Sequence, residues 1–174
     1  MSRWTRKFAA VIMGVALAAA VGCSSQTDPT APVAEAPEPL IIDLLTNLHL
    51  LSCTTQPYAV TTQAVGTQGG VIVVGTHRLV IPADALTQTV TIRAEQVPGS
   101  TNSVRFSPEG LHFQKPAALT LDYSNCSLLL SVFKKVVYTD EQLRILELLP
   151  SIDLQLDRRV TGSISHFSRY AVAW

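Results

Sequence analysis

The sequence lacks the short motifs that mark common phosphate, metal and nucleophile sites. It contains no glycine-rich phosphate loop, no serine-nucleophile elbow and no zinc-binding helix. Its 4 histidines are dispersed, and neither His77 nor His112 has a companion at the short spacing typical of a metal site. No internal repeat of fixed period is present. The sequence therefore predicts a protein without a cofactor or metal and without a recognisable enzymatic site.

The one long apolar run, residues 8–21, is too short and too one-sided for a membrane-spanning helix of about 20 apolar residues. Arg3, Arg6 and Lys7 precede it, and small residues lead up to Cys23, so residues 1–22 are predicted to be an export signal. Residues 20–23, Ala-Val-Gly-Cys, resemble a bacterial lipobox, in which the cysteine is lipid-modified and becomes the mature N-terminus. The alternative is an ordinary cleaved signal followed by a chance cysteine.

Lipidation at Cys23 implies a lipoprotein that acyl chains such as palmitate anchor to a membrane of the cell envelope. Ser24 stands after the cysteine where an aspartate would retain the protein at the inner membrane of diderm bacteria, which implies the outer membrane.

An excess of basic charge is also missing. The chain has 13 Lys and Arg against 13 Asp and Glu, and removal of the three basic residues of the signal leaves 10 against 13, a net charge of −3. Nucleic-acid binding needs a clustered basic face, so this class of partner is not expected. The chain also offers no polybasic attraction to an anionic membrane surface, and the lipid must therefore provide the anchor.

Cysteine is scarce, with 3 in the chain. If Cys23 is lipidated, Cys53 and Cys126 remain as an even pair in an oxidising compartment, where an intramolecular disulfide is expected. Two buried thiols and an intermolecular bond are the alternatives.

Composition divides the rest of the chain into a tether, a short helix and a β-domain. Residues 23–39 are rich in Pro, Ala, Ser and Thr and are predicted to be an extended linker. Over residues 40–52, leucine and isoleucine recur at helical spacing, which predicts a short amphipathic helix. Docking of this helix on the β-domain is favoured over a place in the membrane interface or a partner, because it carries no Lys or Arg.

Residues 53–174 are predicted to form an antiparallel β-sandwich. The hairpin over 69–81 has apolar strands and a turn at residues 75–77, and Pro82 ends its second strand. Further turn-marked strands are predicted at 58–63, 90–95, 104–106, 118–123, 132–138, 142–149, 158–164 and 166–174. Eight or more short strands without intervening helices are typical of two packed antiparallel sheets.

Three segments of this region carry a family resemblance. Residues 69–86 are similar to the "GG…LxIPxGAL" signature of the ZU-five domain, residues 106–116 to its "PxGLxFxKP" segment, and residues 166–171 to its closing "HFSxYA" strand. Asp84 stands where the family usually has glycine. The family includes ankyrins, netrin receptors and zonula occludens proteins, and it implies a β-sandwich that serves as an interaction module.

The triplet His166–Ser168 also resembles the self-cleavage site of autoproteolytic ZU-five domains. That resemblance implies attack by the Ser168 hydroxyl on the Phe167 carbonyl, with His166 as the base. The alternative is an ordinary terminal strand in which His166 and Ser168 share one face and Phe167 lies on the other.

The expected function is therefore that of a lipid-anchored, non-catalytic interaction or structural module with a protein or envelope partner. Self-processing between Phe167 and Ser168 is the second hypothesis.

Overall fold

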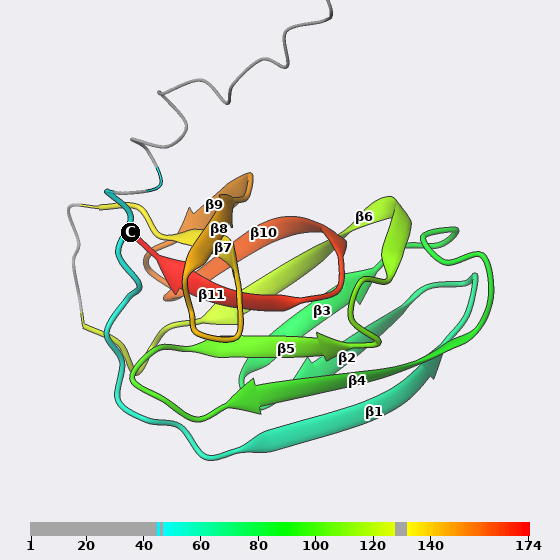
Figure 1. Ribbon diagram of the computed structural model, residues 1–174, viewed down its shortest axis with the longest axis horizontal. Coiled ribbons are helices and arrows are strands. Elements are labelled where there is room, and N and C mark those ends of the chain that lie inside the picture. The colour runs from blue at the N-terminus through cyan, green and yellow to red at the C-terminus, as the bar shows by residue number, and fades with distance from the viewer. Residues whose placement is uncertain (1–44, 46, 128–131) are drawn as a thin grey trace, which may run out of the picture. The chain divides into compact units, whose positions relative to one another are not determined.

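The structure, a computed structural model, describes residue 45 and residues 47–127 and 132–174. The predicted signal, Cys23 and the Pro-rich tether lie outside these residues. Within them the chain is all-β, with two antiparallel sheets packed face to face (Figure 1). The predicted β-sandwich is confirmed.

One sheet has six strands in the order β1-β4-β5-β11-β7-β8, and the other has five in the order β2-β3-β6-β10-β9. The strands of the six-stranded sheet are β1 (Ala59–Val65), β4 (Val90–Val97), β5 (Ser103–Ser107), β7 (Lys135–Thr139), β8 (Ile145–Leu148) and β11 (Arg169–Ala173). Those of the five-stranded sheet are β2 (Gly70–Val74), β3 (His77–Ile81), β6 (His112–Asp122), β9 (Ser151–Leu154) and β10 (Arg159–His166).

The predicted hairpin over 69–81 is present as β2 and β3, which pair from Gly70↔Ile81 to Val74↔His77. Gly69 has φ of 74°, and a Cβ there would lie 2.3 Å from the carbonyl oxygen of Ile81, so only glycine fits. Asp84 has φ of 61°, a conformation that aspartate adopts more readily than most residues. Its carboxylate also accepts a 3.0 Å hydrogen bond from Lys115.

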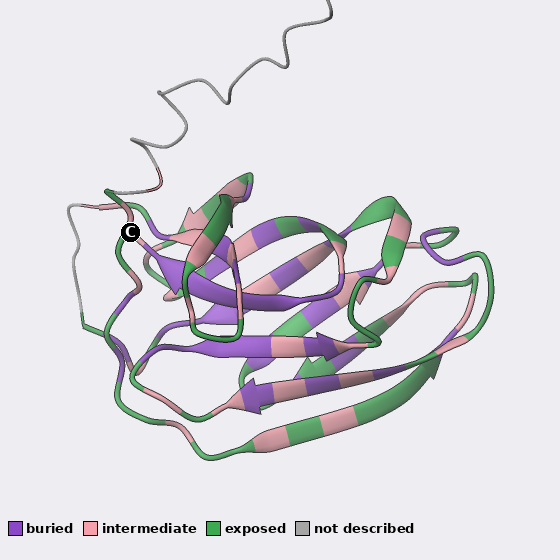
Figure 2. Ribbon diagram, viewed as in Figure 1, coloured by how far each residue is buried: buried purple, intermediate pink, exposed green. Residues whose placement is uncertain are grey.

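The hydrophobic core fills the space between the two sheets. Burial alternates along β4, in which Ile92, Ala94 and Gln96 point inward (Figure 2). The largest fully buried apolar side chains are Leu51, Ile72, Leu79, Ile92, Phe106, Leu119, Leu121, Ile164, Phe167 and Tyr170. Each contributes roughly 1.5–3 kcal/mol by its removal from water.

Strand β11 is buried on both faces because the N-terminal segment and the β7–β8 region cover its outer side. All five of its residues are buried. Tyr170 and Val172 belong to the main core, whereas Ala171 and Ala173 pack with Leu48, Leu50 and other apolar residues in a second cluster. Figure 1 shows β11 running through the middle of its sheet toward the C-terminus.

Two predicted elements differ in part from the structure. The helix predicted over 40–52 lies largely outside the described residues, and its described end, residues 48–52, is extended. There Leu50 bridges Ala173, and the Leu51 amide donates to the carbonyl of Val172 at 2.9 Å. Pairing with β11 buries Leu51 completely and satisfies backbone hydrogen-bonding groups. A helix of about 12 residues has little stability of its own, so the paired, extended conformation is favoured here.

The second difference concerns the end of the chain. Residues 166–174 were expected to form one strand, but His166 ends β10 and β11 begins at Arg169, in the other sheet. The break allows Phe167 to enter the core.

Strand β9 has no counterpart among the predicted strands, because it spans only four residues and exposes Ile152 and Leu154.

Candidate functional site

The triplet His166–Ser168 lies where the chain leaves the five-stranded sheet and enters the six-stranded sheet. His166 pairs with His112 of β6, whereas Arg169 pairs with both β5 and β7. The Ser168 carbonyl already accepts a hydrogen bond from the Phe106 amide of β5 at 3.0 Å. The triplet is therefore the link between the two sheets.

Phe167 anchors this link in the core. Its side chain is fully buried, with its ring 5.3 Å from that of Phe106 in a stacked arrangement and 5.0 Å from that of Phe113 edge-on. Aromatic pairs at such distances contribute about 0.5–1.5 kcal/mol beyond their area burial. The side chain of Phe167 holds the following peptide bond in a fixed position.

Backbone hydrogen bonds hold the Phe167–Ser168 peptide in place from the side of the loop before β6. The Phe167 amide donates to the Leu111 carbonyl at 2.8 Å, and the Gly110 amide donates to the Phe167 carbonyl at 3.0 Å. An amide aimed at a carbonyl oxygen stabilises negative charge that develops on that oxygen. The carbonyl that a serine nucleophile would attack is thus polarised by one backbone donor.

A surface pocket of about 280 Å³ opens beside the triplet. Its lining residues are Glu109, Gly110, His112, Tyr138, His166, Phe167 and Ser168. His112 is exposed, His166 is half-buried, and Ser168 is only 5% exposed. The structure thus brings together His166 and Ser168, as the sequence predicted, and adds His112 and Tyr138, which the sequence analysis did not connect with the triplet.

His166 is surrounded by aromatic side chains. The Tyr170 hydroxyl donates to the His166 carbonyl at 2.6 Å and lies 3.4 Å from His166 Nδ1. The Tyr138 ring meets the imidazole edge-on at 5.0 Å. Burial is the main cause that raises the pKa of Tyr170, so its hydroxyl keeps its proton. Among the described residues no hydrogen bond joins His166 to Ser168.

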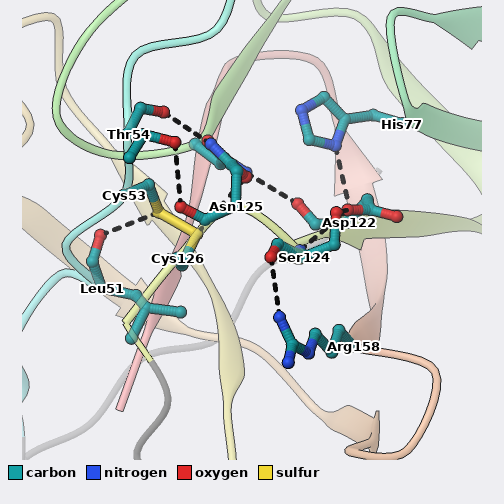
Figure 3. The surroundings of a disulfide bond; sticks show 10 residues. Leu51, Cys53, Thr54, His77, Asp122, Ser124, Asn125, Cys126 and Arg158 are labelled. Atoms are coloured by element: carbon teal, nitrogen blue, oxygen red, sulfur yellow. Dashed lines mark hydrogen bonds between the residues drawn. A yellow bond between two sulfur atoms is a disulfide. The ribbon is translucent and has the colours of Figure 1, made fainter.

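Cys53 and Cys126 form a disulfide, which confirms the predicted intramolecular pairing (Figure 3). Two hydrogen bonds join the residues next to these cysteines. Asn125 Nδ2 donates to the Thr54 carbonyl at 2.6 Å, and the Asn125 carbonyl accepts from the Thr54 amide at 3.0 Å. The bridge joins the N-terminal segment to the turn that follows β6. The disulfide and these hydrogen bonds together hold the two segments, so the disulfide is structural.

The sequence predicted that His77 is part of a turn, but in the structure it is a buried residue of a strand. It is fully buried at the start of β3, and its Nδ1 accepts a hydrogen bond from the Asp122 amide at 3.1 Å (Figure 3). Desolvation lowers its pKa to about 4, although the Asp122 carboxylate opposes this shift. His77 is therefore neutral at pH 7.

Three aspartates that are far apart in the sequence have structural partners. Asp122 pairs with Arg159 at 3.5 Å, Asp140 with Arg144 at 2.5 Å, and Asp153 accepts from the Tyr123 hydroxyl at 2.6 Å. The part of the chain that the structure describes holds no group of three or more His, Cys, Asp or Glu residues able to ligate a metal.

Arg169 is a buried cation that the sequence analysis did not single out. Its guanidinium donates to the Glu141 carbonyl at 2.8 Å and to Ser103 Oγ at 3.0 Å. Burial lowers its pKa from the ordinary value, and the nearby Glu141 carboxylate partly offsets this effect. A single arginine in an apolar strand carries no pattern that distinguishes it from an exposed one.

These features define the protein as a disulfide-linked antiparallel β-sandwich with a small pocket at the crossing between its sheets. No family model matches the chain, and no curated protein matches it. In the described residues, no helix is both long enough and apolar enough to cross a membrane.

Proposed function

We propose that the protein is a lipid-anchored, exported lipoprotein whose β-sandwich acts as a non-catalytic interaction or structural module in the bacterial cell envelope. Cys23 carries the lipid, and residues 23–39 separate the sandwich from the membrane. The resemblance of residues 69–86, 106–116 and 166–171 to ZU-five domains supports an interaction role. The disulfide supports an oxidising compartment, since structural disulfides are rare in the cytosol.

The observation that carries the interaction role is an exposed apolar strip along β9. We define the β9 strip as Phe133, Ile152, Leu154 and Leu156, which are 65%, 70%, 51% and 101% exposed. Phe133, Leu154 and Leu156 line one shallow pocket, and β9 is the edge strand of its sheet. Contiguous exposed apolar side chains mark protein interaction sites, and an edge strand adds unpaired backbone groups. The β9 strip is therefore the proposed partner-binding surface.

Photo-crosslinking in living cells tests the binding surface. A photoreactive amino acid placed at Leu154 is expected to form a discrete adduct with an envelope component, whereas the same amino acid at the exposed Thr62 of β1 is not. Replacement of Ile152 and Leu156 by serine should weaken the adduct. Equal adducts at both positions, or none at Leu154, would contradict this assignment.

Lipidation is tested separately by feeding the cells an alkyne-bearing fatty acid. The unmodified protein is expected to take up the label and sediment with membranes, whereas a Cys23→Ser variant should remain unlabelled. Labelling of that variant, or no labelling of either protein, would remove the lipid anchor from the proposal.

Self-processing is the second candidate function, favoured by the polarised Phe167 carbonyl and by the pocket that His166 shares with Ser168. In this reaction Ser168 Oγ attacks the Phe167 carbonyl carbon while His166 accepts the hydroxyl proton. The Phe167–Ser168 C–N bond breaks as the new Ser168 amine takes up a proton, which leaves an ester. Water then hydrolyses the ester to a carboxylate at Phe167 and a free hydroxyl at Ser168.

An intact-mass measurement under denaturing conditions decides between the two candidates. Denaturation is essential because the released heptapeptide, Ser168–Trp174, contains all of β11 and would stay bound between β5 and β7. A protein starting at Ser24 is expected to have its full mass and to gain two hydrogens on reduction of the disulfide. A mass lower by the heptapeptide, restored in a Ser168→Ala variant, would establish self-processing instead.

A further inference from the structure

Two histidine side chains lie side by side on the five-stranded sheet, although they are far apart in the sequence. His112 at the start of β6 and His166 at the end of β10 are direct cross-strand partners, and their ring centres are 5.6 Å apart. From this pair we infer that the protein binds one divalent transition-metal ion, of the class Cu²⁺, Ni²⁺ or Zn²⁺, between His112 and His166.

The separation of the two rings matches that of two imidazoles on one metal ion. Metal–nitrogen bonds to histidine are about 2.0–2.1 Å long, and ligands of a tetrahedral ion are separated by the tetrahedral angle. From this bond length and this angle, the ring centres of two such ligands are expected to lie about 5 Å apart. The observed 5.6 Å can reach that value by small rotations about the side-chain torsions.

The backbone beside His166 supports this pairing. The register between β10 and β6 shifts between Ile164 and His166, so an irregularity in the ladder precedes the pair. Bulges of this kind re-aim a side chain at the end of a sheet, and they are common next to functional sites. Here the shift places His166 opposite His112.

Tyr170 orients the His166 ring for binding. Its hydroxyl proton is used in the 2.6 Å hydrogen bond to the His166 carbonyl, so the hydroxyl oxygen can only accept from Nδ1, which lies 3.4 Å away. His166 therefore carries its proton on Nδ1 and keeps the Nε2 lone pair for a metal. A hydrogen bond to the second ring nitrogen is the usual support of a metal-ligating histidine.

The surroundings leave room for the remaining ligands. Both histidines line the 280 Å³ pocket, and His112 is exposed, so water can complete the coordination. Among the described residues no third His, Cys, Asp or Glu is placed to join the two histidines, which makes this a two-histidine site. Affinities should follow the general order for nitrogen ligands, with Cu²⁺ bound more tightly than Ni²⁺ and Zn²⁺.

Titration of the tag-free, disulfide-intact protein with Cu²⁺ at neutral pH tests the site. One ion per chain is expected, with at least a tenfold loss of affinity in His112→Asn and in His166→Asn. His49→Asn is the matched control, because this exposed histidine lies on the N-terminal segment beside Trp174, and it should bind as the unmodified protein does. Circular dichroism shows whether each variant is folded.

Electron paramagnetic resonance supplies a readout that folding alone would not change. Two imidazole nitrogens should couple to Cu²⁺ in the unmodified protein and one in each single variant. Tyr170→Phe, if folded, should weaken binding about tenfold, the usual effect of losing a hydrogen bond behind a ligand. Unchanged binding in the double variant His112→Asn/His166→Asn would overturn the site, and unchanged binding in Tyr170→Phe would overturn the assigned role of Tyr170.

Discussion

At the scale of single residues, Gly162 sets how closely the two sheets can approach. A Cβ at this position of β10 would lie 2.6 Å from the Cβ of Val136, a fully buried residue of β7 in the opposite sheet. Gly162→Ala should therefore lower the free energy of unfolding by about 1–3 kcal/mol through overpacking, as measured by urea denaturation. Gly99→Ala is the control, because the nearest heavy atoms lie 4.0 Å from its added Cβ, and it should change stability by less than about 0.5 kcal/mol. Equal effects of the two substitutions would contradict the close contact.

His77 couples the stability of the fold to pH. Because burial lowers its pKa to about 4 from 6.5, the unfolded chain binds a proton between these values that the folded chain does not. Stability is therefore complete above about pH 6.5 and falls as the pH drops to 4, by about 3 kcal/mol from this residue.

The non-titrating variant His77→Asn isolates this contribution. Its free energy of unfolding should be lower than that of the unmodified protein at pH 7, and the difference should shrink by about 3 kcal/mol on going to pH 4. Urea titrations at several pH values measure it. A difference that does not change with pH would show that His77 is not the group responsible.

At the scale of elements, β11 is the strand on which the six-stranded sheet depends. It pairs with β5 on one side and β7 on the other, and its two faces belong to two apolar clusters. Truncation of residues 170–174 should destabilise by several kcal/mol, since each large buried side chain contributes roughly 1.5–3. That loss is comparable with the whole stability of a small domain, so the cooperative melting transition should disappear. Leu156→Ala, at a fully exposed position, is the control that should melt as before. An unchanged melting curve after truncation would show that β11 is not part of the core.

The elements that sequence reasoning found are those with local signals. Gly69 and Pro82 mark the limits of the β2–β3 hairpin, and alternating apolar residues mark β4, so both could be predicted from a few neighbouring residues. The extended end of the helix predicted over 40–52 could not be foreseen, because leucine spacing alone does not reveal a partner such as Ala173. The break after His166 was equally hidden, since a change of sheet depends on pairing with distant strands and leaves no local pattern in the sequence.

The candidate site likewise has a part with a local signal and a part without one. The triplet His166–Ser168 could be found from its resemblance to a known motif. The Gly110 amide and the cross-strand His112 could not, because pairing between β6 and β10 brings them to the triplet. The position of the Tyr170 hydroxyl could not either, because it depends on the change of sheet between β10 and β11. Residues from distant strands can be assigned to one site only when the pairing register of those strands is known.

At the scale of the whole molecule, the N-terminal segment ties the two sheets together. Its residues 49–51 hydrogen-bond to the end of β11, in the six-stranded sheet. Two residues further on, Cys53 is bonded to Cys126, in the turn after β6 of the five-stranded sheet. One short stretch of chain thus holds both layers of the sandwich, by backbone pairing on one side and by a covalent bond on the other.

Removal of the disulfide should therefore weaken the sandwich as a unit. The bridge closes a loop between positions 73 residues apart, which on the loop-entropy relation stabilises by about 4 kcal/mol. The double variant Cys53→Ser/Cys126→Ser should lose about that much free energy of unfolding, in a single cooperative urea transition at lower denaturant concentration. Reductant should destabilise the unmodified protein by a similar amount and leave the double variant unchanged. If reductant destabilised the double variant equally, or if two separate transitions appeared, the disulfide would not be the link that makes the two layers unfold together.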